Sequence, residues 1–394
     1  MKFYLIISAI LLVQTSMMLS CKKTETPAPK AVIPKLSFDD VTITEGNSSG
    51  VKAILTFYLS ESTKSTVSFI WSTVDSTAKA GEDYEAVSGS TVTFNPGETT
   101  KTIQINIISD TILEFNEKFN VKISGLQNAT STKSTASVTI LNDDSYTAEL
   151  TTDGYITPDT YPEMTLVWSD EFNAATLNTS DWNYETGGGG WGNNELEVYT
   201  NSADNSYLQD GYLTIKALKN PYTGSYTSAR ITTKGKKEFT YGRIDIRAKM
   251  PIGQGLWPAL WMLGSNISSV GWPTCGEIDI MEYLGSGPYT VYGTAHYYDG
   301  GHKSSGGHYT LTTPENFNDK FHVYTIMWQE NSIEWFVDYH KYFTANSTTI
   351  KFDAFNLAQF FVFNLAVGGT WPGNPNSSTV FPQSMVVDYV RVFQ

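Results

Sequence analysis

Cysteine is scarce in this sequence, which has 394 residues and only two cysteines, Cys21 and Cys275. Two cysteines do not make the disulfide framework of a small secreted domain. Positive charge is scarce as well, because 26 lysines and arginines stand against 40 aspartates and glutamates, a formal net charge of −14. Binding to nucleic-acid phosphates is therefore not expected.

Charged residues of both signs make up only 17% of the chain, whereas Trp, Tyr and Phe make up 13% and glycine occurs 31 times. Few charges combined with many aromatic rings and much glycine suggest an all-β protein that holds a neutral, flat-faced ligand. The length is too great for one ordinary domain and suits two.

The apolar run at the N-terminus, from Phe3 to Val13, is too short to span a membrane comfortably and follows the single positive charge of Lys2. Residues 1–21 are therefore interpreted as a signal peptide. The segment 22–35 is rich in Pro and Lys, which is typical of an extended tether.

The signal peptide ends in Met18-Leu19-Ser20-Cys21, which resembles the lipobox of bacterial lipoproteins, although Leu is usual where Met18 stands. The resemblance implies cleavage before Cys21, lipidation of that cysteine and attachment to a membrane through the lipid anchor. We expect an outer-membrane lipoprotein that faces the cell surface. The alternative is a freely secreted enzyme with an incidental cysteine.

Residues 36–144 alternate between apolar and polar side chains, as in Ile103, Ile105 and Ile107 and again in Phe119 and Val121. Several short alternating strands in about 110 residues predict a β-sandwich. Its acidic residues stand at the expected strand ends. They are Glu45, Asp83, Asp110, Glu114, Asp143 and Asp144.

The stretches "TEGN", "AGEDYEAVSG", "FNPGETTKTIQI" and "VTILNDD" make residues 36–144 resemble a Calx-β domain, an immunoglobulin-like sandwich. The resemblance implies that the acids just named gather at one end and bind Ca²⁺, which prefers oxygen ligands. Ser109, Thr111 and Asn142 stand where calcium-rich members tend to carry Asp, so fewer ions or weaker binding are expected. The alternative is that these acids are solvated turn residues.

Residues 145–160 are polar and turn-rich and predict a linker, and residues 161–394 are again rich in strand patterns. The second domain is predicted to be a larger two-sheet sandwich such as a jelly roll.

The stretch "GEIDIMEY" (276–283) places Glu277, Asp279 and Glu282 among apolar residues. Successive side chains of a strand face opposite ways, so Glu277 and Asp279 share a face and Glu282 has the wrong parity. A β-bulge between Asp279 and Glu282 would absorb one residue and return Glu282 to that face. Two long side chains leaning together could then reach roughly 5–5.5 Å between carboxyl groups, the spacing of retaining glycosidases.

Three acids this close should repel one another and raise at least one pKa. A neutral carboxylic acid beside an ionised one suits double displacement at a sugar carbon. For the bare pattern, a cation site or a solvated strand edge is the alternative. The nearby Trp257 and Trp261 favour the sugar, because indole rings offer flat apolar faces to sugar rings.

The chain from about 161 to 394 resembles glycoside hydrolase family 16, on the stretches "LVWSDEFN", "GGGGWGNNELEVYT", "GQGLWPALWML", "WPTCGEIDIMEY" and "FNLAVGGTWPGNP". The likeness is to laminarinase-type endo-β-1,3-glucanases, which have a concanavalin A-like β-jelly roll and bind β-glucan in a cleft. It implies that Glu277 is the nucleophile, Asp279 its assistant and Glu282 the general acid/base.

The same resemblance places a structural Ca²⁺ at Glu171, the Gly211 carbonyl and Asp388, unless Asp388 is a plain strand acid. It suggests five sugar-binding residues. They are Asn194, Arg243, Trp257, Trp261 and His296. Arg243 could equally pair with a catalytic acid, and His296 could be a core histidine.

Four other functions stay open from the sequence. They are hydrolysis of a mixed-linkage or other β-glucan, hydrolysis of a galactan, transglycosylation, and carbohydrate binding without turnover. The complete trio of acids argues against the last. A monomer is expected.

Replacing Cys21 with Ala tests the anchor. Two or more acyl chains hold a protein stably in a bilayer, at about 0.8 kcal/mol per buried CH₂. We expect the variant to move from the membrane fraction to soluble material, or to stall as precursor. Unchanged fractionation, together with no acyl mass on the mature N-terminus, would contradict lipidation.

Overall fold

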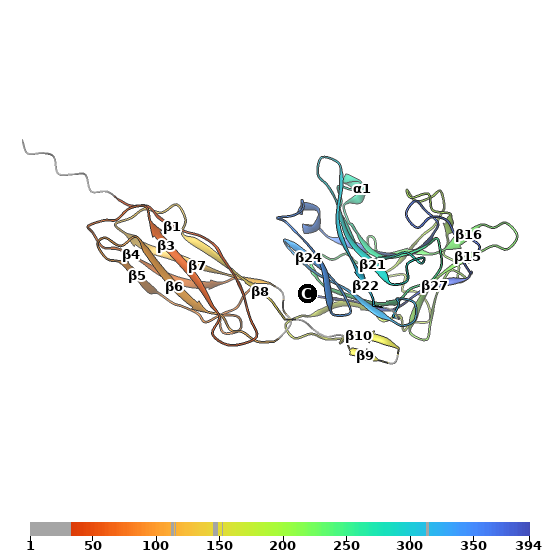
Figure 1. Ribbon diagram of the computed structural model, residues 1–394, viewed down its shortest axis with the longest axis horizontal. Coiled ribbons are helices and arrows are strands. Elements are labelled where there is room, and N and C mark those ends of the chain that lie inside the picture. Colours follow the sequence, from red (N-terminus) through yellow and green to blue (C-terminus); the bar gives the residue numbers. More distant parts are fainter. Residues whose placement is uncertain (1–32, 112–113, 115, 145–148, 152, 313–314) are drawn as a thin grey trace, which may run out of the picture.

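The computed structural model describes residues 33–394 except 112–113, 115, 145–148, 152 and 313–314 (Figure 1). The predicted signal peptide, Cys21 and nearly all of the tether lie outside the described residues. Within the described part, regular structure is almost entirely β-strand, apart from the helix α1 (Ile267–Val270) and the 3-10 turn η1 (Asp353–Asn356). None of the helices seen there is long and apolar enough to cross a membrane.

The N-terminal domain is a sandwich of two sheets with strand orders β1-β3-β6 and β2-β8-β7-β4-β5. The alternation predicted from the sequence places Leu55 and Phe57 of β3 in the core, together with Ile103 and Ile105 of β6. The strands are β1 (Leu36–Phe38), β2 (Val41–Thr44), β3 (Lys52–Leu59), β4 (Val67–Asp75), β5 (Ser90–Phe94), β6 (Thr100–Asn106), β7 (Glu117–Gln127) and β8 (Thr135–Leu141).

The C-terminal domain consists of a seven-stranded and a ten-stranded sheet packed face to face, which confirms the predicted jelly roll. The seven-stranded sheet has the order β12-β17-β26-β19-β20-β21-β22. Its strands are β12 (Asn183–Glu185), β17 (Arg230–Thr232), β19 (Leu256–Gly264), β20 (Glu277–Tyr283), β21 (Thr290–Tyr298), β22 (His302–Thr310) and β26 (Gln359–Val367).

The ten-stranded sheet follows the path β13-β16-β15-β27-β18-β23-β24-β25, and β11 and β14 join it beside this path. Its strands are β11 (Leu166–Asp170), β13 (Glu197–Tyr199), β14 (Ser206–Gln209), β15 (Tyr212–Lys219), β16 (Tyr226–Ser228), β18 (Gly242–Lys249), β23 (His322–Gln329), β24 (Ser332–Val337), β25 (His340–Asn346) and β27 (Gln383–Phe393).

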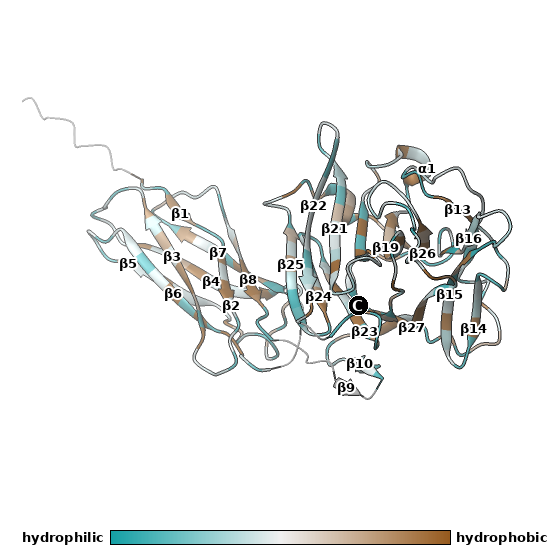
Figure 2. Ribbon diagram, turned by 45° about the vertical axis from the view of Figure 1, so that its right-hand side comes forward, coloured by the Kyte–Doolittle hydropathy of each residue, from teal (hydrophilic) through white to brown (hydrophobic). Residues whose placement is uncertain are grey.

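The core of this domain lies between the two sheets, where β19 and β26 carry the hydrophobic colour in Figure 2. These two strands pair over nine residues, from Leu256 opposite Val367 to Gly264 opposite Gln359. Every residue of β26 is buried. β20 pairs with β19 on one side and β21 on the other. The strand that carries the three acids therefore has backbone partners on both sides, within the most buried part of the sheet.

The segment predicted as a linker contains two short paired strands, β9 (Glu149–Thr151) and β10 (Gly154–Ile156). Tyr155 donates its backbone N–H to Phe321 O at 2.9 Å, and Phe321 donates to Asp153 O at 3.0 Å. Gly154 is required for this approach, because a Cβ there would lie 2.1 Å from Phe321 O. This part of the linker is thus fastened to the C-terminal domain.

Further contacts hold residues 153–160 against β18 and β27. Arg247 Nε donates to Tyr155 O at 2.5 Å, Thr157 N donates to the Tyr389 hydroxyl at 2.9 Å, and Arg391 Nη1 donates to Thr157 O at 3.2 Å. Gln329 also donates to Asn116 O of the N-terminal domain at 3.2 Å, which joins the two lobes seen in Figure 1.

A chain of residues 153–394 should therefore be more stable than one of residues 161–394. The shorter chain loses at least five hydrogen bonds of about 1 kcal/mol each, and it leaves buried arginines with fewer acceptors. We expect its thermal midpoint to be lower by on the order of 5 °C or more in calorimetry. Equal midpoints would show that 153–160 adds nothing to the fold.

Candidate active site

The β-bulge predicted in β20 is confirmed. On β21, Asp279 stands opposite Thr294 and Glu282 stands opposite Tyr292, so three steps on β20 match two on its partner. The extra residue reverses the parity of Glu282 and returns it to the face of Glu277 and Asp279. We call this face of the seven-stranded sheet the acidic face.

Both outer carboxylates accept a hydrogen bond from an indole. Trp272 Nε1 donates to Glu277 Oε2 at 3.0 Å, and Trp257 Nε1 donates to Glu282 Oε1 at 3.1 Å. A hydrogen bond to an ionised acceptor is stronger than one between neutral groups. Each indole therefore favours the charged form of its carboxylate.

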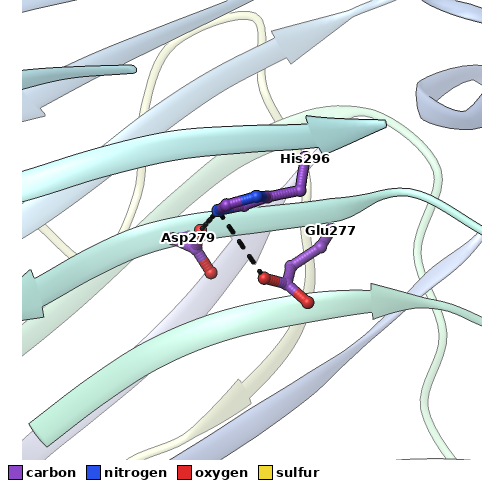
Figure 3. A group of neighbouring side chains, drawn as sticks. All are labelled: Glu277, Asp279 and His296. Carbon is purple, nitrogen blue, oxygen red and sulfur yellow. Dashed lines mark ion pairs between the residues drawn. The ribbon is translucent and has the colours of Figure 1, made fainter. Parts of the chain in front are cut away.

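His296, which the sequence suggested as a sugar-binding residue, lies directly opposite Glu277 on β21. Its Nε2 is 3.2 Å from Asp279 Oδ2 and 3.8 Å from Glu277 Oε1, the two contacts drawn in Figure 3. The imidazole thus faces two acids at once, which excludes the alternative of an isolated core histidine. A proton on Nε2 can be shared with either carboxylate.

Burial is the main influence on the three acids. It raises the pKa of Glu277 to about 8, with repulsion from Asp279 adding to the rise and His296 opposing it. Burial also raises the pKa of Asp279 to about 8 and, together with repulsion from Asp279, the pKa of Glu282 to about 8. The sequence predicted raised values from mutual repulsion, but loss of water is the larger cause. Each proton lost opposes the next, so neutral and ionised acids coexist near neutral pH.

The bulge is supported from below by a residue that the sequence did not reveal. Trp335 of β24 is fully buried and donates Nε1 to Asp279 O at 2.9 Å. Gly293 of β21 makes room for it, because a Cβ there would lie 2.4 Å from Trp335 Cδ1. Only the pairing of two sheets brings this indole to the bulge, so no local signal could have predicted it.

Aromatic rings continue from Glu282 along the acidic face. Trp371 meets Trp257 edge-on at 5.5 Å between ring centroids and Tyr292 at 5.0 Å. Trp371 is 44% exposed, as expected for a ring available to a ligand. Trp257 was predicted from the sequence, whereas Trp371 and Tyr292 were not singled out.

Asn194 belongs to a loop that is fastened beside this aromatic group. Its Nδ2 donates to Thr370 Oγ1 at 3.1 Å, and Thr370 N donates to Asn193 O at 2.8 Å. Asn194 has φ of +60°, a left-handed conformation that Asn tolerates better than most residues. The structure therefore places Asn194 beside Thr370, the residue before Trp371, and its role in sugar binding stays a prediction.

Trp261 lies on the same face as Trp257, opposite Asp279 on the neighbouring strand. Its Nε1 donates to Asn364 Oδ1 at 2.8 Å, and the guanidinium of Arg230 lies 4.8 Å from its ring centroid. Arg230 in turn pairs with Glu185 at 2.6 Å. Arg230 and Asn364 are thus two further residues of this face that sequence reasoning missed.

Arg243 corrects an expectation, since it is not on the acidic face. It lies on β18 of the ten-stranded sheet, is 5% exposed and pairs with Asp245 at 2.9 Å. Its guanidinium also packs on the Tyr161 ring at 4.4 Å. A charge enclosed in this way is a structural ion pair, and it pairs with none of the three acids.

Two clusters in the N-terminal domain have the donor chemistry of calcium sites. Carboxylate oxygens converge to within 4.8 Å of one another in each. The first contains Glu45, Asp110 and Asp144, and the second contains Asp83, Glu114 and Glu117. Burial raises the pKa of Glu45 to about 7 and of Glu114 to about 8, with neighbouring acids adding to both. Crowded carboxylates of this kind fit a divalent cation.

Two residues differ from the sequence prediction here. Glu117 was not singled out, and burial raises its pKa to about 8 as well. Asp143 was singled out from the sequence, but it accepts a hydrogen bond from Gly46 N at 2.8 Å and lies outside both clusters. Calcium in this domain would be held by the six converging acids.

The predicted calcium ligands of the C-terminal domain are paired with arginines. Glu171 accepts two hydrogen bonds from Arg391, both at 2.8 Å, and Asp388 accepts one from Arg247 at 2.5 Å. Gly211 lies beside Asn173. A cation at this place would have to share both carboxylates with arginines, and calcium here stays a prediction.

Comparison with known proteins adds two family matches. The sequence profile described as "Glycosyl hydrolases family 16" matches residues 192–391, and the profile described as "Calx-beta domain" matches residues 31–144. The first match contains all three acids of β20, and the second covers the N-terminal sandwich.

Individual proteins resemble the C-terminal part. "Glucan endo-1,3-beta-glucosidase A1" of Niallia circulans is 43% identical over 264 residues, which are 59% of this chain and 38% of that protein. "Beta-glucanase" of Rhodothermus marinus is 42% identical over 252 residues, 60% of this chain and 87% of the other. The chain therefore spans well under half of the first relative and most of the second.

Among solved structures, the catalytic domain of an endo-1,3-beta-glucanase (laminarinase) from Thermotoga petrophila is 45% identical. It aligns with a TM-score of 0.55 over 59% of this chain and 98% of the other. The similarity thus covers essentially that whole domain and leaves the N-terminal sandwich unmatched.

Replacing Glu277 with Gln tests the strain in the acid cluster. The pKa of Glu277 is raised from 4.5 to about 8 in the folded protein, so the folded state binds more protons between these values. Stability is then lost as pH rises through this window. We expect the variant to be more stable than the wild type at pH 8, by on the order of 1 kcal/mol, and no more stable at pH 4.

Urea unfolding at the two pH values measures this difference. Glu330→Gln, which changes an exposed carboxylate, is the matched control and should change neither value. An equal effect of Glu277→Gln at pH 4 and pH 8 would contradict the assigned strain.

Proposed function

The chain belongs to the glycosyl hydrolases of family 16, and we propose that it is a retaining endo-β-1,3-glucanase, a laminarinase, that hydrolyses β-glucan. The observation that carries the proposal is the pair of carboxylates, Glu277 and Glu282, brought to one face by the bulge and each supplied with an indole N–H. The names of the relatives support the substrate, since they specify endo-1,3-β-glucosidase and laminarinase.

In the first half of the reaction, the Glu277 carboxylate attacks the anomeric carbon and the glycosidic bond breaks. Glu282 gives its proton to the departing oxygen, so that the leaving chain departs as an alcohol. Glu277 is suited to be the ionised partner because Trp272 donates to it and His296 faces it. Burial raises the pKa of Glu282 to about 8, as it does that of Glu277, but of these two only Glu277 forms an ion-pair contact with His296, so Glu282 is better suited to hold the proton.

In the second half, Glu282 is a carboxylate and takes a proton from water. The water oxygen attacks the anomeric carbon and Glu277 leaves, which restores both residues. Two inversions give net retention, so the released reducing end is β. Asp279 is 3% exposed and lies between the two acids on β20. It can hold a proton toward Glu277 while Glu277 is ionised, and this hydrogen bond weakens when Glu277 becomes a neutral ester, with no proton transferred to or from Glu277.

The surroundings of the acids favour a neutral polymer over a sulfated one. Trp257, Trp261 and Trp371 offer ring surface. The guanidinium of Arg230 is already paired with Glu185. A sulfated galactan would call for arginines or lysines free to bind anions, so the galactan alternative is disfavoured.

Two alternatives from the sequence are answered differently. Binding without turnover is disfavoured, because the acids carry the donors and raised pKa values that the chemistry uses and that binding does not. Transglycosylation uses the same two steps with a sugar in place of water, and product analysis separates it from hydrolysis.

We further propose that Cys21 anchors the protein in the outer membrane, facing the surface, and that the protein is a monomer. The N-terminal sandwich would then act as a spacer between tether and enzyme, with Ca²⁺ held by its two acidic clusters. Calcium there would lower the repulsion among carboxylates and stiffen the spacer. No step of the reaction uses it.

The function is tested by digesting laminarin with the purified protein. We expect soluble oligosaccharides of several lengths from the start, as an endo-acting enzyme gives, with reducing ends released in step. Glu277→Gln and Glu282→Gln should each lower kcat by at least about 10³-fold and still bind the polymer, because the aromatic rings remain. Hydrolysis of mixed-linkage glucan or agarose with laminarin left intact would contradict the substrate.

A further inference from the structure

We propose that His302 is a positioning residue for this reaction, holding His296 and Trp272 where both act on the nucleophile Glu277. The proposal rests on the proposed function for its catalytic consequence, and on the geometry of the acidic face for the contacts themselves. Among the described residues, His302 forms no hydrogen bond or ion pair with the three acids, so its effect would pass through its two neighbours.

The sheet brings His302 to this place from the next strand. β21 pairs with β22 so that His296 stands opposite Ser304, and His302 is two residues further along. Residues two apart on a strand share a face, so His302 is the diagonal neighbour of His296 on the acidic face. Long or aromatic side chains reach one another across such a diagonal.

One contact of His302 is a hydrogen bond. Its Nε2 lies 2.8 Å from Nδ1 of His296, and the two rings are nearly parallel, at 16°. One hydrogen atom must lie between these nitrogens, because two would clash and none would leave lone pairs opposed. Whether Nε2 of His302 carries a hydrogen therefore decides whether Nδ1 of His296 accepts or donates this hydrogen bond.

The contacts on the other side of the His296 ring show which of its nitrogens should carry hydrogen for the reaction. Its Nε2 faces Asp279 at 3.2 Å and Glu277 at 3.8 Å, so a hydrogen on Nε2 can be shared with carboxylate oxygens. When Nδ1 also donates, to a neutral His302, the His296 ring carries a positive charge beside the nucleophile. An acceptor at position 302 thus holds a hydrogen on Nδ1 of His296.

The charged groups around the two histidines are consistent with His302 as the acceptor of this hydrogen bond and His296 as its donor. Burial, together with the charge of His296, lowers the pKa of His302 below its ordinary value. The titratable groups that face the pair are Glu277, Asp279 and Glu282 of β20, and the adjacent segment contributes the uncharged Trp272. Two cationic rings at 2.8 Å would repel, so the lowered pKa of His302 keeps that ring neutral as an acceptor for Nδ1 of His296.

The second contact of His302 is with the indole that donates to the nucleophile. The rings of His302 and Trp272 lie 4.5 Å apart, whereas Trp272 and His296 are 6.3 Å apart. Trp272 is 48% exposed and lies in the turn between α1 and β20, so packing from a neighbouring side chain helps to hold its ring. Packing on His302 keeps its N–H directed at Glu277.

Three variants separate these two contacts. His302→Phe keeps a ring against Trp272 and removes the hydrogen bond. His302→Gln keeps an acceptor for His296 Nδ1 and removes the ring. His302→Ala removes both. His340→Phe is the control, because His340 is an exposed histidine that stacks on Tyr309 and contacts none of the acids.

We expect His302→Phe to lower kcat on laminarin about tenfold with KM changed less than twofold. His296 opposes the rise in the pKa of Glu277, so displacing His296 should raise that pKa and move the acidic limb of the kcat/KM profile to higher pH. His302→Gln should restore the limb to its wild-type position, and His302→Ala should be the slowest. His340→Phe should match the wild type.

The hydrogen bond is measured separately by histidine ¹⁵N NMR of the full chain, with no substrate present. In the wild type, Nδ1 of His296 should carry hydrogen at every pH at which the fold is intact. In His302→Phe the two tautomers of neutral His296 should mix. This readout is independent of the substrate, so a failure of the proposed function leaves it able to support or overturn the contact.

Three results would overturn the proposal. They are an unshifted acidic limb in His302→Phe, an equal loss in His302→Phe and His302→Gln with the profile unchanged, and an unaltered His296 tautomer in His302→Phe. If the wild type hydrolyses no glucan while the tautomer changes as expected, the contact is upheld and the proposed function is at fault.

Discussion

The removal of three carboxylates from water on a single strand is the constraint on which the C-terminal domain depends. β20 is an interior strand with backbone partners on both sides, and Asp279 is 3% exposed. Carboxylates there lose hydration, and burial raises the pKa of each to about 8. The energy needed to hold them comes from the large apolar core between the two sheets, not from local pairing. The raised pKa values lower the stability of the folded protein, and they also allow one acid to hold a proton for donation beside another that is ionised.

The bulge and the indoles arrange the three buried acids for the reaction. Without the extra residue, Glu282 would point into the core, and with it the three acids meet on one face. Trp335 holds the irregular backbone from below, while Trp257 and Trp272 hold the outer acids from the sides. The division of charge among the acids then follows from their partners. Each outer acid accepts one indole hydrogen bond, and Glu277 has in addition an ion-pair contact with His296 at 3.8 Å.

Features that depend on the residue pattern of a single strand could be predicted from the sequence. Features that depend on how two strands or two sheets pack together could not. Parity along "GEIDIMEY" predicted the bulge, and alternation predicted both sandwiches. Trp371, Arg230 and Trp335 were missed because strand register and sheet packing bring them to the acids, and neither can be read from local pattern. The prediction that Arg243 binds sugar was wrong, and the local sequence already contained the signal against it. Arg243, Asp245 and Arg247 alternate on one face of β18, so the charges of that strand have partners near at hand, and Arg243 does pair with Asp245. Cys21 stays a prediction, since it lies outside the described residues.

The central claim is that Glu277 forms the covalent bond to the sugar. The most direct measurement is to trap that bond with a 2-deoxy-2-fluoro laminaribiosyl fluoride, whose second step is slow, and to locate the added mass by peptide mass spectrometry. We expect one disaccharide per chain, on the peptide that contains Glu277, and none in Glu277→Gln. A label on Glu282 or Asp279, or no label with a substrate that is still turned over, would contradict it.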